Sequence, residues 1–353
     1  MDKFKKYFAC FVCIAILVLT CSLETYAAEP QIAAKAAVLI DASNGEILFA
    51  KNENAKLQMA STTKILTTLL TLESGDLDSF FEVDSDAIKV EGSSMGLKQG
   101  NLVTKRMLCY GMMLPSGNDA ANAAAVSVGG SISGFVEMMN KRVSDMGLEN
   151  THFVTPSGLD DFTTEHYSTA YEMALIAREA LNNQDFREIC KTKSIKLAFG
   201  DGKEFWLSNT NRLLKECDGV IGVKTGFTDK AGRCLISACE RNGTTLICVT
   251  LNDPNDWLDH TNLYDYGFKL VKTVDIGGLR LKLPCVGGSK DYGIAYTNSK
   301  KVSVMSENSG DLKSFVLVPR FIYLPTNDDE VIGKVVYKIE DKIIAELDLR
   351  FKN

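Results

Sequence analysis

Alternating apolar runs near the start of the chain predict a pair of antiparallel strands. The runs cover residues 37–40 and 47–49 and flank Asn44-Gly45, a dipeptide typical of a tight hairpin turn. Over residues 57–72 apolar and small residues instead recur at helical spacing, and this segment stops near Gly75, as a buried helix does. Similar patterns predict further helices at about residues 104–114, 118–128, 132–146 and 168–182.

Strand character returns in the second half of the chain. The three runs cover residues 220–225, 233–239 and 245–251, and a second Asn-Gly turn joins the last two. With the N-terminal pair they predict a five-stranded antiparallel sheet, with a helix at about residues 259–272 packed on one face. After residue 273 short alternating runs predict a small all-β domain.

The predicted fold class is therefore α+β: a five-stranded antiparallel sheet with a helical subdomain, followed by a small C-terminal β domain. We expect a catalytic domain over residues 29–273 and the β domain over residues 274–353. The C-terminal stretch 343–349 alternates like a strand and not like an amphipathic membrane helix.

The N-terminus predicts export from the cytoplasm. Lys3, Lys5 and Lys6 precede an uncharged stretch over residues 7–23, and small residues suited to cleavage follow, so residues 1–28 are expected to be a secretory signal peptide. The apolar stretch is also nearly long enough for an uncleaved anchor. Under either interpretation the remainder works outside the cytoplasm, secreted or associated with the cell membrane or wall, with peripheral membrane association left open.

The net charge and the distribution of cysteines argue against several classes of function. A formal net charge of −6 argues against non-specific nucleic-acid binding, which requires a basic surface excess. Three of the ten cysteines lie in the signal region, leaving an odd number, so a complete disulfide framework is excluded. Cys234, Cys239 and Cys248 lie in apolar runs and are expected to be buried free thiols. No metal motif occurs, and no cofactor is expected.

Ser61 and Lys64 form the first candidate for chemistry. Serine is a poor nucleophile until a nearby base removes its proton, and residues at i and i+3 share one helix face. Ser61 also lies near the predicted helix N-terminus, where free N–H groups favour an oxyanion. Ser61 is the only serine here with a lysine three residues on, although the same pattern also fits an ordinary helix start with a snorkelling lysine.

Two further short motifs could complete this site. In Ser116-Gly117-Asn118 the serine could relay a proton and the asparagine could orient the base, although for this motif alone a helix N-cap at Ser116 or Asn118 is the more usual explanation. In Lys224-Thr225-Gly226 the ammonium and hydroxyl could hold a substrate carboxylate, and glycine would let the substrate approach the strand edge, while an exposed strand-end lysine is the plain alternative. A second cation near Lys64 would also lower the pKa of Lys64, as a general base requires.

The three motifs occur in this order at separations of about 55 and 110 residues, and a chance coincidence of all three is improbable. On these motifs the chain resembles the low-molecular-mass penicillin-binding proteins that act as D-alanyl-D-alanine carboxypeptidases. Three other stretches carry the resemblance: Gly92-Ser93-Ser94 followed by Leu97-Lys98-Gln99-Gly100, His166-Tyr167-Ser168-Thr169-Ala170, and the segment from Gly222 to Gly232.

The resemblance implies a serine-type carboxypeptidase that removes the terminal D-alanine from peptidoglycan stem peptides ending in D-Ala-D-Ala and that β-lactam antibiotics inhibit. It implies that Ser61 forms the acyl-enzyme with Lys64 as base, and that Ser116 and Asn118 assist proton transfer and positioning. The substrate-binding residues it implies are Lys224, Thr225, Gly226, Phe227 and Thr228, and the oxyanion hole uses the N–H groups of Ser61 and Phe227. Two positions depart from some relatives, which have histidine at Phe227 and arginine at Thr210.

Three alternatives remain open at this stage. A β-lactamase shares the Ser-x-x-Lys and Lys-Thr-Gly motifs but needs a water-holding glutamate, and residues 149–160 contain no Glu-x-x-Leu-Asn pattern. A non-catalytic cell-wall binding protein could keep the fold, although binding alone needs neither nucleophile nor base. Finally, Gly92-Ser93-Ser94-Met95-Gly96 fits a nucleophile elbow at Ser94, but its flanks are polar, and a mobile loop beside Ser61 fits them better.

Overall fold

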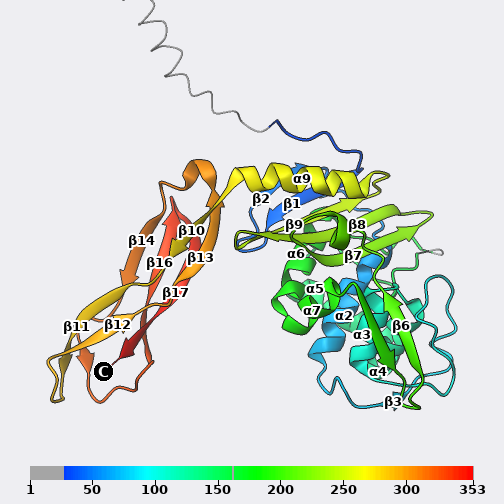
Figure 1. Ribbon diagram of the computed structural model, residues 1–353, viewed down its shortest axis with the longest axis horizontal. Helices are drawn as coiled ribbons and strands as arrows, with labels where there is room; N and C mark the ends of the chain where they lie inside the picture. The colour runs from blue at the N-terminus through cyan, green and yellow to red at the C-terminus, as the bar shows by residue number, and fades with distance from the viewer. Residues whose placement is uncertain (1–27, 161–162, 353) are drawn as a thin grey trace, which may run out of the picture.

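The computed structural model describes residues 28–160 and 163–352 (Figure 1). The signal peptide predicted over residues 1–28 lies outside these described residues, apart from its last position. Within the described ranges, no helix combines the length and the apolar character that a membrane span needs.

The centre of the larger region is a five-stranded antiparallel sheet with strand order β2-β1-β9-β8-β7, which confirms the predicted fold class. Both predicted Asn-Gly hairpins are present, as β1–β2 and β8–β9. The strands are β1 (Ala36–Asp41), β2 (Ile47–Lys51), β7 (Val220–Thr228), β8 (Gly232–Arg241) and β9 (Thr244–Leu251). Strand β7 is therefore an edge of the sheet, and no other strand pairs with its outer side among the described residues.

Both faces of this sheet are covered, because alternate residues of its strands enter different cores. Val38 and Ile40 of β1 pack with the helical subdomain, while Leu39 between them packs with helix α9 (Asp256–Leu270) on the other face. Figure 1 shows this layering, with α9 on one side of the sheet and helices α2 to α7 on the other. The predicted C-terminal helix at residues 259–272 is thus confirmed, with its start three residues earlier.

The helical subdomain contains the predicted central helices with bounds close to those expected. They are α2 (Lys64–Glu73), α3 (Lys105–Met113), α4 (Asn118–Gly129), α5 (Ile132–Asp145) and α6 (Ala170–Asn182). The sequence patterns did not predict the next elements, which are α7 (Gln184–Lys191), the hairpin β5 (Ser194–Ala198) and β6 (Glu204–Ser208), and the short α8 (Leu213–Glu216). A short strand pair, β3 (Phe81–Glu82) and β4 (Leu102–Val103), brackets the loop before α3.

The prediction of one helix over residues 57–72 was wrong at its start. A 3₁₀ turn, η1 (Ala60–Thr63), precedes α2, and Leu57 instead forms a β-bridge with Ser168. The break lies at Ala60, whose φ of 48° is left-handed and incompatible with a continuing right-handed helix. Ser61 therefore lies in a 3₁₀ turn, in which residues i and i+3 lie directly above one another.

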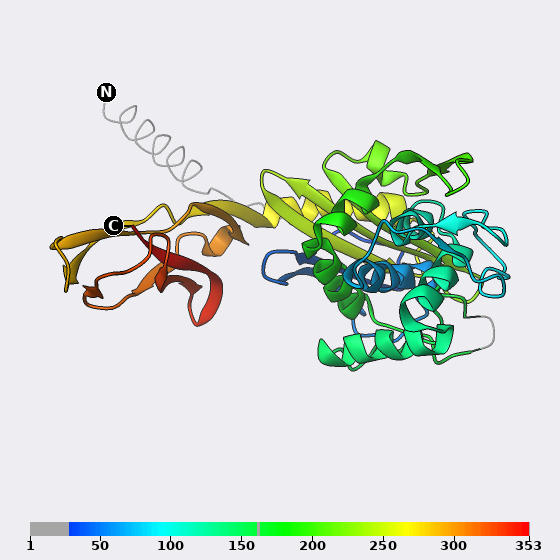
Figure 2. The ribbon, with the colours of Figure 1, turned by 90° about the horizontal axis from the view of Figure 1, so that it is seen from below.

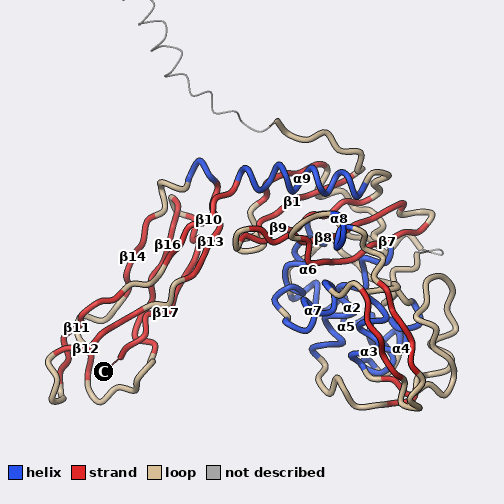
Figure 3. The backbone as a smooth tube through the Cα atoms, viewed as in Figure 1, coloured by secondary structure: helices blue, strands red, loops and turns tan. Residues whose placement is uncertain are grey.

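The C-terminal region is all-β, as predicted, and lies beside the sheet-and-helix region in both views (Figure 1, Figure 2). Figure 3 shows that strand β10 (Val271–Ile276) follows α9 directly. The predicted domain boundary at residues 273/274 thus falls inside β10, and it stays a prediction. The other strands are β11 (Arg280–Val286), β12 (Tyr292–Tyr296), β13 (Lys300–Met305), β14 (Lys313–Leu317), β15 (Ile322–Tyr323), β16 (Val331–Ile339) and β17 (Lys342–Lys352), with a 3₁₀ turn, η2 (Ser306–Asn308), after β13.

Candidate active site

The side chains of Ser61 and Lys64 are in hydrogen-bond contact. Lys64 Nζ lies 2.9 Å from Ser61 Oγ, 2.7 Å from Asn118 Oδ1 and 2.6 Å from the carbonyl oxygen of Ser157. The last two oxygens can only accept hydrogen bonds. A neutral amine has two N–H groups and one lone pair, so these two acceptors use both N–H groups and direct the lone pair at Ser61 Oγ. The geometry thus prepares Lys64 to take the Ser61 proton.

The surroundings also favour the neutral form of Lys64. Its side chain is fully buried, and burial lowers its pKa well below the ordinary range. The charge of Lys224 lowers the pKa of Lys64 further, while the carboxylate of Asp119 opposes both effects. Lys224 itself is 1% exposed, and burial lowers its pKa to about 7. Its Nζ donates to the carbonyl oxygen of Thr225 at 2.8 Å.

Ser116 and Asn118 lie where α3 gives way to α4. The N-cap of α4 is Gly117, which makes no side-chain cap bond, so the N-cap explanation for Ser116 and Asn118 does not hold. Ser116 has a φ of 67°, a left-handed conformation that places its hydroxyl at the cavity described below. Asn118 Nδ2 donates to the carbonyl oxygen of Glu91 at 2.7 Å, which fixes its Oδ1 toward Lys64.

The segment around Ser94 is a loop and not a strand-to-helix elbow, which rules out the alternative nucleophile. Asp119, a residue that the motifs did not single out, fastens this loop beside Ser61. One Asp119 oxygen accepts from Ser94 Oγ at 2.6 Å, and the carboxylate also accepts from the backbone N–H groups of residues 95, 96 and 97. The predicted position of the loop is therefore right, but these bonds do not support its predicted mobility.

Gly158 is a second residue that the sequence did not indicate. It lies with φ at 89° against the turn that carries Ser61, and a Cβ there would be 2.0 Å from the carbonyl oxygen of Ala60. Gly226 is also close, since a Cβ there would be 3.1 Å from the backbone nitrogen of Ser61. Glycine at both positions allows the backbone to approach the nucleophile.

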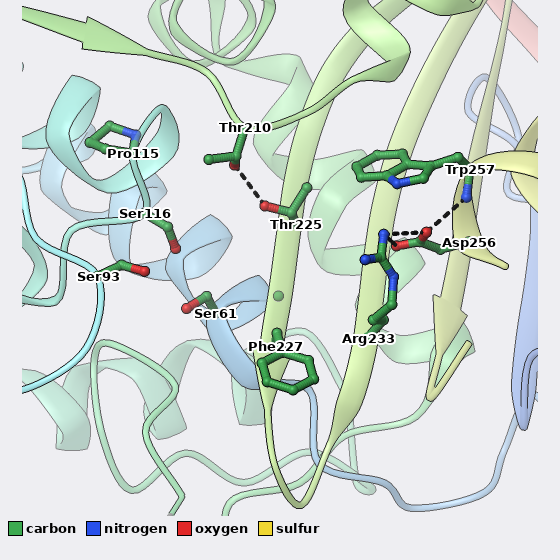
Figure 4. Close-up of a pocket in the computed structure, with 11 residues that line it drawn as sticks. Ser61, Ser93, Pro115, Ser116, Thr210, Thr225, Phe227, Arg233, Asp256 and Trp257 are labelled. Atoms are coloured by element: carbon green, nitrogen blue, oxygen red, sulfur yellow. Dashed lines mark hydrogen bonds and ion pairs between the residues drawn. The ribbon is translucent and has the colours of Figure 1, made fainter. Parts of the chain in front are cut away.

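A cavity of about 310 Å³ opens over Ser61 (Figure 4). Its lining residues are Ser61, Ser93, Pro115, Ser116, Thr210, Thr225, Gly226, Phe227, Arg233, Asp256 and Trp257. Thr225 and Thr210 share a hydroxyl hydrogen bond of 2.9 Å, so Thr210 lies beside the proposed binding strand. Neither Lys224, which is buried on the inner face of β7, nor Thr228, whose hydroxyl donates to Asp160, belongs to this lining.

The structure thus brings together most of the residues that the motifs predicted, from segments far apart in the chain. It also adds Arg233, Asp256 and Trp257, which no motif contains. The pairing of β7 with β8 places Arg233 opposite Phe227, and the sequence did not predict this register.

The chain is similar to known proteins along most of its length. A family model described as D-alanyl-D-alanine carboxypeptidase matches residues 23–255. The chain is 33% identical over 327 residues to the D-alanyl-D-alanine carboxypeptidase DacF of Bacillus subtilis, covering 89% of this chain and 83% of the relative. It is 31% identical over 337 residues to DacA of Escherichia coli strain K12, which has the same enzyme name, covering 90% and 82%.

Solved structures are similar as well. Penicillin binding protein 5 from Haemophilus influenzae superposes with a TM-score of 0.68 at 29% identity, over 92% of this chain and 98% of that one. The Streptomyces K15 DD-transpeptidase superposes with a TM-score of 0.64 at 33% identity, over 69% of this chain and 99% of that one. With a family model that covers most of its length and relatives similar along nearly all of it, this chain belongs to the D-alanyl-D-alanine carboxypeptidase family of serine enzymes.

Proposed function

We propose that the enzyme removes the terminal D-alanine from peptidoglycan stem peptides through an ester on Ser61. The observation that carries this proposal is the hydrogen-bonding of Lys64, whose Nζ faces two obligatory acceptors and the Ser61 hydroxyl. A buried, neutral lysine in contact with a serine hydroxyl is suited to general-base catalysis.

The proposed acylation step uses these groups in order. Lys64 takes the Ser61 proton while Oγ attacks the carbonyl carbon of the penultimate D-alanine, and the backbone N–H groups of Ser61 and Phe227 stabilise the resulting oxyanion. The C–N bond then breaks, and the Lys64 ammonium returns the proton to the leaving amine, with Ser116 as relay. Asn118 keeps Lys64 oriented throughout. Water later attacks the ester and releases the shortened peptide.

The substrate is proposed to run along the open edge of β7. Thr225 offers a hydroxyl to the terminal carboxylate, Gly226 permits close approach, and the exposed ring of Phe227 packs on the peptide. Lys224 attracts the carboxylate from the inner side of the strand while it lowers the pKa of Lys64.

The β-lactamase alternative is less well supported, because among the described residues that line the cavity Asp256 is the only carboxylate, and it is paired with Arg233. Since the described lining residues include no unpaired carboxylate to activate water, we expect a penicilloyl ester on Ser61 to be released slowly. A purely binding role gives no reason to bury Lys64, whose desolvation is unfavourable. We also propose that β-lactams acylate Ser61, and that the enzyme acts outside the cytoplasm, where its substrate and its predicted signal peptide place it.

Release of free D-alanine from a diacylated peptide ending in D-Ala-D-Ala tests this function. Wild type should release one D-alanine per peptide, and an otherwise identical peptide ending in L-Ala should be inert. Lys64→Met and Ser61→Ala should each abolish release while they keep the fold. Release that persists in Ser61→Ala, or a wild type that neither releases D-alanine nor reacts with penicillin, would refute the proposal.

A further inference from the structure

The cavity over Ser61 contains one exposed cation that no motif assigns. Among the described residues that line it, Arg233 and Asp256 are the two with a formal charge. The side chain of Arg233 is 42% exposed, whereas that of Asp256 is 4% exposed. A ligand that enters the cavity therefore meets the guanidinium and not the carboxylate.

The guanidinium of Arg233 is held in place by contacts that engage only some of its nitrogen atoms. Its Nη2 donates to both oxygens of Asp256, at 2.6 and 2.9 Å, and its Cζ lies 5.4 Å from the centre of the Trp257 ring. Within the described part of the chain, its Nε is buried and has no hydrogen-bond partner. A ligand cannot reach this buried Nε, but the two hydrogen bonds to Asp256 use Nη2 alone, so the exposed remainder of the guanidinium can still donate to an acceptor in the cavity.

Sheet geometry places this cation beside Thr225. Thr225 pairs with Leu235 and Phe227 pairs with Arg233, so Thr225 and Arg233 are diagonal neighbours on the same face of the sheet. Such neighbours lie about 7–8 Å apart, within reach of a long side chain. Lys224 points to the opposite face, because successive strand residues alternate. Figure 4 shows the guanidinium next to the strand that carries Thr225, below Trp257.

We infer that Arg233 is a specificity-determining residue that binds the terminal carboxylate of the substrate together with the Thr225 hydroxyl. The inference rests on the proposed function, since it adds a second charged group, besides Lys224, to the carboxylate-binding part of that same site. Guanidinium donors match carboxylate oxygens in geometry and retain their charge at all working pH values. Asp256 and Trp257 fix the guanidinium before the substrate arrives, which lowers the entropic cost of binding.

The test compares two substrates that acylate Ser61 alike and differ at the leaving group. One is a diacylated peptide that ends in D-Ala-D-Ala with a free carboxylate. The other is the same peptide with this terminal carboxylate converted to a methyl ester. Arg233→Gln removes the charge, while its amide can still donate to Asp256. We expect kcat/KM for the carboxylate substrate to fall about 10- to 100-fold, from the loss of one charged hydrogen bond, and kcat/KM for the methyl ester to stay within about twofold of wild type.

Two further variants make the result specific. Arg233→Lys keeps the charge without the planar donor geometry and should give an intermediate loss on the carboxylate substrate alone. It also decides the question if Arg233→Gln does not fold. Arg212→Gln is the matched control, because Arg212 also stacks on Trp257, at 5.8 Å, but does not line the cavity, and it should leave both substrates unchanged.

Equal losses on both substrates, or no loss on either, would overturn the role of Arg233 and leave the proposed function standing. A wild type that acts on neither substrate and does not react with penicillin would instead remove the proposed function, and this inference with it.

Discussion

The contact between Gly158 and the Ser61 turn makes a sharp prediction for Gly158→Ala. The new Cβ would lie 2.0 Å from the carbonyl oxygen of Ala60, 2.5 Å from the Ala60 carbonyl carbon and 3.0 Å from the Ser61 nitrogen. Contacts under 3.0 Å are not tolerated, so the Ala60–Ser61 peptide must retreat by about 1 Å (3.0 − 2.0). A displacement of that size at a nucleophile costs on the order of 10²-fold in rate.

Gly158→Ala also adds backbone strain, because alanine at a φ of 89° costs about 1–2 kcal/mol. Gly130→Ala is the matched control: its φ is 72°, and a Cβ there meets nothing within 4 Å. We expect Gly130→Ala to lose similar stability but to react with fluorescent penicillin at the wild-type rate. Gly158→Ala should fold, as its circular dichroism would show, and react about 100-fold more slowly. A folded Gly158→Ala that reacts at the wild-type rate would refute the packing argument.

Four further substitutions test the surroundings of the site. Burial lowers the pKa of Lys224 from 10.5 to about 7, so between these pH values the unfolded chain binds the extra proton and wild type gains stability as pH rises. The stability of Lys224→Met relative to wild type, measured by urea unfolding, should therefore decrease by about 1.4 kcal/mol per pH unit over that range. Acylation of Lys224→Met by penicillin should also require a higher pH than acylation of wild type, because Lys224 lowers the pKa of Lys64. Acylation rates of the two proteins with the same pH dependence would contradict this. Asp119→Asn should destabilise the loop before α3 by about 2–3 kcal/mol and increase its proteolysis, whereas Ser94→Ala, which removes one of its bonds, should do less. Thr225→Val should lower kcat/KM for D-alanine release about tenfold with little change in Tm, and an unchanged kcat/KM would exclude its hydroxyl from binding.

The sheet was predictable because its strands and turns are local signals. Asn44-Gly45 and Asn242-Gly243 each specify a two-strand hairpin, and both hairpins are present. The start of α2 was not predictable, because residues 57–59 have helical spacing while the fold uses Leu57 to bridge Ser168. Here a long-range contact overrides a local pattern.

The residues of the candidate site also divide into those that the sequence could predict and those that it could not. Ser61 and Lys64 are close in sequence, so one turn sufficed to predict their contact. Ser157 and Gly158 contact that turn from about 95 residues away, and nothing in their own sequence marks them. Asp119 directly follows a predicted motif, yet its partners lie more than 20 residues earlier, in a loop without periodicity. Residues that position others through backbone contacts are not marked by a sequence motif, because such contacts use backbone groups that nearly every residue type carries.

The central claim is that Ser61 becomes acylated with Lys64 as its base. Peptide mapping by mass spectrometry after a brief reaction with penicillin tests it most directly. The account predicts a single penicilloyl adduct on the peptide that contains Ser61, absent in Ser61→Ala and formed at least about 100-fold more slowly in Lys64→Met. An adduct on Ser94 or another residue, or one that forms at the wild-type rate without Lys64, would contradict it.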